Sequence, residues 1–365
     1  MKDSSVKTRA ALAILLLIAV LSAAAYTQRA QIAVGIFTRT AEKRMAEMPL
    51  TDLPDGLHVG LCGSGSPMPD VRRSAPCTVV LAGKRVFIFD AGANASRGIA
   101  RMGINVGDIE AIHLTHFHSD HMDGLGELML MSWVAGVRST PVPVRGPEGV
   151  ETIVSGLMQA YAQDKQYRVA HHGEKRVPPG GFGGTAQPFS IVGGPFGSKL
   201  IVDEPELKIL AFGVSHEPVH PAVGYRITYK DRSVVISGDT SKSLSVEREA
   251  KGADLLVHEV LSKKLVGILE DSARKAGRED IAKIFHDIPE YHTWPEQVAE
   301  IARSANVGAV LLTHVVPSLP PVPGAEAAFL GDARDIYSGK LVLGRDGDFV
   351  SLPAGSKQIQ FSNRW

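Results

Sequence analysis

The feature that most constrains this chain is a cluster of histidine and aspartate side chains directly after an apolar segment. Within six residues it offers four side chains of the kind that bind metals: His116, His118, Asp120 and His121. The apolar segment 111–115 precedes the cluster and a Leu- and Met-rich segment, 124–135, follows it, which predicts a strand, a loop and a helix in that order. His116 and His118 are two residues apart, so they would project to the same side of an extended segment. The fold must therefore end a strand where these side chains can converge.

The number of candidate ligands predicts two metal ions. Imidazole and carboxylate groups together suit zinc, and also manganese or iron. Four candidates on so short a loop exceed what one tetrahedral ion takes readily, so further ligands are expected from elsewhere. Three candidates each follow an apolar, strand-like segment: His216, Asp239 and His314. Asp239 could bridge two cations with one oxygen on each. His220 is an alternative candidate for the same position. We favour His216, because it stands at the end of the apolar segment 207–214.

Short apolar segments separated by Gly, Pro and Asp predict a fold built on sheets. Strands are expected at 58–61, 78–81, 86–89, 111–115, 207–214, 223–229, 234–237, 254–257 and 307–313. Helices are expected at 124–135, 261–285 and 295–304, and an exposed loop at 178–195. Strands and helices thus alternate twice, which favours two sheets between outer helices. Their order alone would also fit a doubly wound sheet, and the clustered metal ligands favour the first arrangement.

The pattern His-x-His-x-Asp-His, with the later His216, Asp239 and His314, resembles the metallo-β-lactamase superfamily from about residue 59 to about residue 320. Segments 63–69, 89–92, 237–240 and 256–259 resemble its ribonuclease Z and arylsulfatase-like branch. The resemblance implies an α/β fold of the αββα type, with two mixed sheets packed face to face and helices outside. A true β-lactamase of this superfamily commonly has Cys where Asp239 stands, and a residue other than His where His121 stands. Antibiotic hydrolysis is therefore not expected.

The resemblance also assigns roles to residues. It implies that one divalent metal is held by His116, His118 and His216, and the other by Asp120, His121 and His314, with Asp239 as the bridge. Asp120 would also orient the attacking water, and His258 would protonate the leaving group, although Val260 departs from the usual small residue nearby. Asp90 would hydrogen-bond a ligand imidazole. We interpret His292 as a residue at the entry of a helix and His113 as structural.

The N-terminus resembles an export signal. Lys2, Lys7 and Arg9 precede the apolar run 10–21 and the small residues 22–25, a pattern that is typical of a signal peptide or an inner-membrane anchor. The expected organisation is a signal or anchor at 1–27, a linker at 28–52, a hydrolase domain at 53–355 and a tail at 356–365. The positive flank would leave the body outside the cytoplasm, in the periplasm or anchored facing it. Cys62 and Cys77 are interpreted as unpaired buried residues, although an oxidising compartment would permit a disulfide.

The leading functional hypothesis is hydrolysis of a small anionic phosphate or sulfate ester by a water that two metals activate. Lys plus Arg and Asp plus Glu both number 39, so there is no global basic field. For this reason, and because of the export signal, no nucleic-acid partner is expected. The motif resemblance itself favours an alternative, a ribonuclease Z-like endonuclease that processes transfer-RNA 3′ ends. A lactone or thioester hydrolase and a non-enzymatic metal-bearing sensor also stay open. A dimer is compatible with the sequence, which leaves the oligomeric state undecided.

Overall fold

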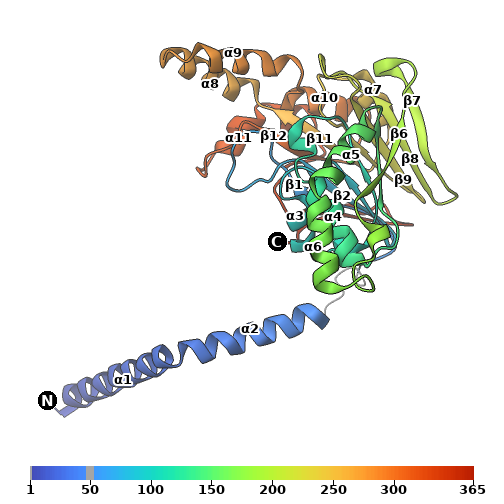
Figure 1. Cartoon of the computed structure of the whole chain (residues 1–365). Helices are drawn as coiled ribbons and strands as arrows, with labels where there is room; N and C mark the ends of the chain where they lie inside the picture. The colour runs from blue at the N-terminus through green and yellow to red at the C-terminus, as the bar shows by residue number, and fades with distance from the viewer. Residues whose placement is uncertain (1, 47–52) are drawn as a thin grey trace. The chain divides into compact units, whose positions relative to one another are not determined.

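The computed structural model describes residues 2–46 and 53–365, which belong to two compact units dividing after residue 51 (Figure 1). The first unit contains helices α1 (Lys2–Thr27) and α2 (Arg29–Ala46). Within α1, the 19 residues Arg9–Thr27 have a mean hydropathy of 2.3 and expose their side chains. They are long and apolar enough to cross a membrane, although a signal sequence meets the same criterion. Helix α2 shows that much of the expected linker 28–52 is helical, and residues 47–52 lie outside the described part.

The body, which is described from residue 53 to the end, is built on two mixed β-sheets. The first has the strand order β15-β14-β1-β2-β3-β4-β5-β6 and the second β13-β12-β11-β10-β9-β8-β7. The strands of the first sheet are β1 (Gly56–Gly63), β2 (Cys77–Ala82), β3 (Arg85–Phe89), β4 (Ile109–His113), β5 (Val142–Pro147), β6 (Gly184–Phe189), β14 (Asp348–Pro353) and β15 (Gln360–Asn363). Those of the second are β7 (Ser198–Asp203), β8 (Leu207–Gly213), β9 (Val223–Tyr229), β10 (Arg232–Ile236), β11 (Leu255–Leu261), β12 (Ala309–Val316) and β13 (Lys340–Leu343).

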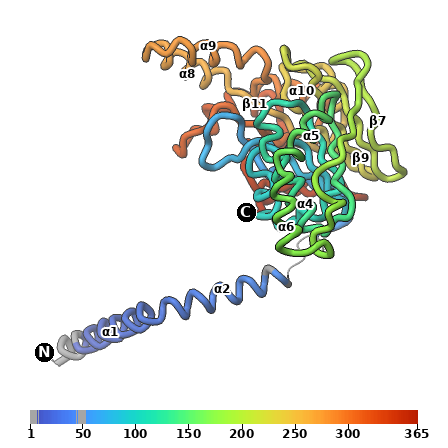
Figure 2. Tube along the Cα trace, in the orientation of Figure 1, coloured from blue at the N-terminus to red at the C-terminus, as the bar shows by residue number. Residues whose placement is uncertain are grey.

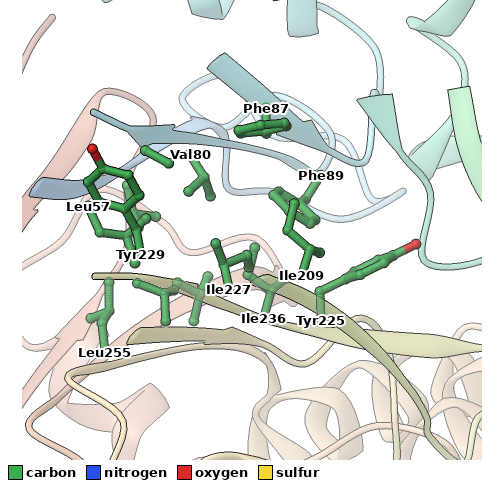
Figure 3. Packing of buried hydrophobic residues seen from close by; sticks show 14 of the residues in the cluster. Leu57, Val80, Phe87, Phe89, Ile209, Tyr225, Ile227, Tyr229, Ile236 and Leu255 are labelled. Atoms are coloured by element: carbon green, nitrogen blue, oxygen red, sulfur yellow. The ribbon is translucent and has the colours of Figure 1, made fainter. Parts of the chain in front are cut away.

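The main core lies between the two sheets. Leu57, Val80 and Phe87 reach it from the first sheet. Ile227 and Leu255 reach it from the second, and all five are fully buried (Figure 3). Burying a side chain of this size stabilises a fold by roughly 1.5–3 kcal/mol, so this contact holds the sheets face to face. Strands β3 to β6 are parallel to one another, as are β10 to β13, so several strands end at the same edge.

Helices cover the outer faces of the sandwich. The first sheet carries α3 (Ala95–Arg101), α4 (Leu125–Gly136), α5 (Val150–Ala160) and α6 (Ala162–His172). The second carries α7 (Leu244–Glu249), α10 (Pro295–Ser304), α11 (Ala325–Leu330) and α12 (Ala333–Ile336). Helices α8 (Lys263–Lys275) and α9 (Glu279–Asp287) form a hairpin that projects from the body (Figures 1 and 2). The predicted αββα sandwich is confirmed.

Several local predictions were wrong. The expected loop 178–195 contains β6, which pairs in parallel with β5. The single helix expected at 261–285 is broken at Gly277, whose φ of 70° lies in the left-handed region that commonly ends helices. Residues 360–363 of the expected tail pair with β14 as β15. Cys62 and Cys77 form a disulfide with their Cα atoms 5.0 Å apart, so the interpretation of unpaired cysteines was wrong.

His113 leads to a prediction about stability at acidic pH. It is fully buried on β4, where its ring stacks on Phe89 with centroids 4.7 Å apart and lies 5.7 Å from the Tyr225 ring. Burial, and then the charge of Arg145, lower its pKa to about 3. Below the ordinary histidine pKa of about 6.5 the unfolded chain takes up a proton that the folded ring refuses. His113 therefore leaves the free energy of unfolding unchanged above that pH and lowers it progressively as the pH falls toward 3.

We expect wild type to lose about 2 kcal/mol more unfolding free energy between pH 7 and pH 5 than His113→Phe. Urea denaturation of the metal-free full-length proteins at the two pH values measures this difference. The comparison uses the change with pH within each protein, so a general destabilisation by the substitution cancels. An identical loss in both proteins would mean that the folded His113 ring accepts the proton.

Candidate metal centre

Asp90 organises the loop that carries the histidine cluster. It follows β3 with a positive φ of 59°. Its carboxylate accepts hydrogen bonds from the Thr115 backbone N–H at 2.8 Å and from the Thr115 hydroxyl at 2.9 Å. It also lies 2.8 Å from Nδ1 of His121. One buried side chain thus fixes both the path of the loop after β4 and the orientation of a ligand ring, as the resemblance implied.

A first group of donor atoms comes from His116, His118, His216 and Asp239, all within 4.8 Å of one another. Nε2 of His116 lies 3.0 Å from Nδ1 of His118, and Nε2 of His216 lies 3.4 Å from the same atom. In His116 and His216 the ring nitrogen that faces away from the group has a hydrogen-bond partner. Nδ1 of His116 is 3.0 Å from the Thr115 hydroxyl, and Nδ1 of His216 is 3.0 Å from the carbonyl of Tyr291. The Thr115 hydroxyl donates its proton to Asp90, so it accepts one from His116.

A second group is formed by Asp120, His121 and His314. Oδ2 of Asp120 lies 3.2 Å from Nε2 of His314 and 3.5 Å from Nε2 of His121. Asp239 reaches both groups with a single oxygen. Its Oδ2 is 3.3 Å from Nε2 of His121 and 3.2 Å from Nε2 of His314. The same atom is 3.9 Å from Nε2 of His116 and 3.9 Å from Nε2 of His216. Asp239 therefore occupies the position expected of a bridging carboxylate.

These residues fit two divalent cations. When Nδ1 of His116 and of His216 carries the proton, the lone pairs on their Nε2 atoms converge near His118, an arrangement that is repulsive unless a cation lies between them. Donor atoms bound to one tetrahedral zinc at about 2.0–2.1 Å lie roughly 3.3–3.4 Å apart, close to the separations in each group. Burial lowers the pKa of His116 well below its ordinary value and that of His216 to about 4. Both rings are therefore neutral, as metal ligation requires.

The charge of Asp239 shapes its surroundings. Burial opposes the ionised carboxylate, but His314 and His121 outweigh it and hold the pKa of Asp239 well below the usual range. Burial together with the Asp239 charge raises the pKa of Glu259 well above its ordinary value. Burial also opposes charge on His121, yet Asp239 and Asp90 raise the pKa of that ring. The carboxylates of the centre thus stabilise positive charge beside them, which favours bound cations.

His292 belongs to this site, and the sequence analysis had interpreted it only as a residue at a helix entry. Its ring is stacked on His314 with centroids 5.3 Å apart, and it lies 5.3 Å from the His216 ring. Nδ1 of His292 is 3.2 Å from Oε2 of Glu259. The local sequence, with Trp294 and Pro295 after it, signals only the start of α10. The distant contact with Glu259 on β11 places His292 at the metal centre.

The remaining candidates lie elsewhere. His258 is fully buried on β11, with Nδ1 2.7 Å from the carbonyl of Glu259, and burial lowers its pKa to about 4. It belongs to neither donor group, and its role as a proton donor stays a prediction. His220 is exposed and outside both groups, which agrees with the choice of His216.

The fold and the two donor groups define a metal-dependent hydrolase. Residues 71–286 match the family model described as the metallo-beta-lactamase superfamily, and the chain belongs to this superfamily. A ribonuclease Z of Mycolicibacterium gilvum is 34% identical over 301 residues, covering 82% of this chain and 97% of that protein. A ribonuclease Z of Mycobacterium avium is 33% identical, covering 82% of this chain and all of that protein. The crystal structure of the short form of human tRNase Z covers 81% of this chain and 99% of its own, with a TM-score of 0.58 and 20% identity, a likeness of fold.

These relatives contradict the expectation of no nucleic-acid partner. Proteins named ribonuclease Z match this chain over nearly their whole length. The expectation relied on the balanced total charge, which excludes a global basic field but says nothing of local ones. Total charge was therefore the wrong criterion for this fold.

Proposed function

We propose that this protein hydrolyses phosphodiester bonds in RNA, using two divalent ions, most naturally zinc. The observation that carries the proposal is the donor arrangement in which Asp239 faces both groups, within a chain about a third identical to proteins named ribonuclease Z. Histidines and carboxylates, all buried except His118, match zinc chemistry better than the all-oxygen sites of magnesium or calcium. These relatives support the alternative of the sequence analysis, a ribonuclease Z-like endonuclease, better than its leading hypothesis of small-ester hydrolysis.

Each side chain of the centre is proposed to have a separate role in the reaction. Bound ions would supply Lewis acidity toward the phosphate and lower the pKa of water. Asp120, held at 3.2 Å from His314, would orient the attacking water and accept its proton. His292 would deliver a proton to the leaving oxygen from the ring nitrogen that Glu259 does not hold. Glu259, 3.2 Å from Nδ1 of His292, would keep the ring in its orientation. General acid catalysis of this kind contributes roughly 10²–10⁴-fold.

Cleavage of a 3′-extended precursor transfer RNA by the zinc-loaded full-length protein in detergent tests the proposal. We expect endonucleolytic release of the 3′ extension, loss of activity with a chelator and recovery on adding zinc. Asp120→Asn serves as the inactive control and excludes contaminating nucleases. Hydrolysis of small esters with no cleavage of RNA would overturn the proposal.

Metal content gives an independent prediction. Among the described residues, seven candidate ligands form two of the three clusters of potential donors, and the third cluster combines His292 with Asp239 and His314. Protein purified without chelator should therefore contain about two equivalents of metal by elemental analysis. His216→Ala removes a ligand of the first group only, so the variant protein should lose the ion of that group more readily than the other ion. A stoichiometry fixed at one in wild type, even after zinc supplementation, would contradict the two-ion centre.

A second candidate function is hydrolysis of a small phosphate or sulfate ester outside the cytoplasm. Two observations favour it: the apolar, exposed segment Arg9–Thr27 and the Cys62–Cys77 disulfide, since disulfides persist mainly in oxidising compartments. On this proposal the chain is exported or anchored in the inner membrane, with its body in the periplasm. A phosphatase reporter fused after Trp365 should then be active, whereas a fluorescent reporter that folds only in the cytoplasm should stay dark. The reverse pattern would remove the support for this candidate.

A further inference from the structure

A cleft of about 720 Å³ lies between the α8–α9 hairpin, the start of α10 and the loop after β10. Three of its lining residues are Lys242, Lys263 and Trp294. The proposed reaction does not account for this cleft. Figures 1 and 2 show the helices α8, α9 and α10 that contribute to its lining.

His292 lies between the cleft and the metal centre. This ring lines the cleft, and it also stacks on His314 and contacts Glu259. Lys242 enters the cleft three residues after Asp239 in the chain. If His292 protonates the leaving oxygen, the group bonded to that oxygen must extend past His292. The cleft therefore lies on the leaving-group side of the reacting phosphate.

The lining combines flat aromatic surface with positive charge. Trp294 and Phe285 are partly buried and pack around the apolar side chains Val266 and Val316. The ammonium group of Lys263 lies 4.0 Å from the centroid of the Trp294 ring. Lys263 forms no ion pair with a carboxylate in the described part of the chain, whereas Lys242 contacts Glu300 at 2.6 Å. The charge of Lys263 is thus available to an anion that approaches over the aromatic surface.

The aromatic surface and the Lys263 charge together indicate which class of ligand fits the cleft. A free inorganic anion would leave the aromatic surface unused, and an uncharged aryl group would leave Lys263 unused. A nucleotide supplies both a base that stacks on aromatic rings and a phosphate that pairs with lysine. The carboxylates of Glu270 and Glu290 also line the cleft. Glu270 is paired with Arg274 and His286, whereas Glu290 can accept a hydrogen bond from a base amino group and makes a run of several phosphates unfavourable. The chemistry therefore favours a single nucleotide.

We propose that this cleft binds the nucleotide of the RNA that departs with the leaving oxygen. Its base lies against Trp294 and Phe285, and its next phosphate lies near Lys263. This assignment rests on the proposed function. It makes Lys263 a residue that determines substrate preference, because it acts only on substrates that extend beyond the reacting phosphodiester.

The test compares Lys263→Ala with Lys264→Ala in the zinc-loaded full-length protein. Lys264 is the matched control, since it is exposed on the same helical turn but does not line the cleft. The substrates are 3′-extended precursor transfer RNA and bis(p-nitrophenyl) phosphate, which has no further phosphate. For Lys263→Ala we expect kcat/KM on RNA to fall about tenfold, mainly through KM, because binding remote from the reacting centre is lost. Activity on the small diester should stay within about twofold of wild type, and Lys264→Ala should match wild type on both substrates.

The outcomes distinguish failure of the cleft assignment from failure of the proposed function. If wild type cleaves RNA but Lys263→Ala and Lys264→Ala behave alike, the cleft assignment is wrong and the proposed function stands. If Lys263→Ala slows both substrates equally, the cleft belongs to small esters and not to a nucleotide. If wild type hydrolyses the small diester but not RNA, the proposed function fails and the nucleotide assignment fails with it.

Discussion

Asp239→Ala should lose both metal ions and all measurable turnover together. Oδ2 of Asp239 is within 3.3 Å of ring nitrogens in the second donor group and within 3.9 Å of ring nitrogens in the first. Removing it takes a ligand from each ion and also removes the negative charge that offsets their mutual repulsion. Among the substitutions considered for this centre it should therefore have the largest effect on metal content. Elemental analysis and phosphodiesterase assays on the same sample measure both consequences.

Asp90→Asn is the control for this prediction. Asp90 touches the loop and His121 and belongs to neither donor group. Losing an outer partner of this kind typically costs about 10–100-fold in metal affinity or activity, so this variant should recover activity when zinc is added in excess. Asp239→Asn, which keeps the side-chain volume, should not recover, and circular dichroism should show that it is folded. If Asp239→Ala retains two equivalents of metal, the bridging assignment is wrong.

Much of this centre could be predicted because each ligand comes after a run of apolar residues, either beyond the end of its strand or, for His314, within β12. The strands β4, β8 and β12 are buried over most of their length, so their sequences read as apolar runs, and the polar residue after each run stands out. His216 and His314 were identified in this way, and the structure places them with the His116 cluster. Nothing in the strand pattern, however, determines which distant segments then pack on that edge.

The residues that escaped prediction depend on such distant contacts. His292 stands in a turn between α9 and α10, where neighbouring residues signal only a helix start; it becomes part of the site because Glu259 lies beside it. The cleft likewise requires the α8–α9 hairpin to pack beside α10, which the sequence pattern, interpreted as one long helix, could not indicate. The disulfide depends on Cys62 and Cys77 lying on adjacent antiparallel strands, a pairing that became visible only with the register of β1 and β2.

The second large effect is the loss of rate when the proton donor is removed. If His292 is the donor, substituting it should lower the rate, and if His258 is the donor, substituting that residue should. His292→Ala should retain both metals, since the seven ligands remain, and should lower kcat on precursor transfer RNA by roughly 10²–10⁴-fold. The deficit should shrink on bis(p-nitrophenyl) phosphate, because nitrophenolate is a weak base that departs with little protonation. Glu259→Gln should give a smaller deficit with the same dependence on the leaving group, because the ring remains but loses the carboxylate that orients it.

His258→Ala distinguishes the two hypotheses. The His258 ring is enclosed in β11, with Nδ1 against the carbonyl of Glu259. If it only supports the strand, the substitution should lower the free energy of unfolding by leaving a cavity, and any loss of rate should be equal for good and poor leaving groups. A loss that depends on the leaving group in His258→Ala, and not in His292→Ala, would return the donor role to His258. Loss of a metal ion in His292→Ala would instead make His292 a ligand, consistent with its closeness to Asp239 and His314, and the proton would then have to come from another group.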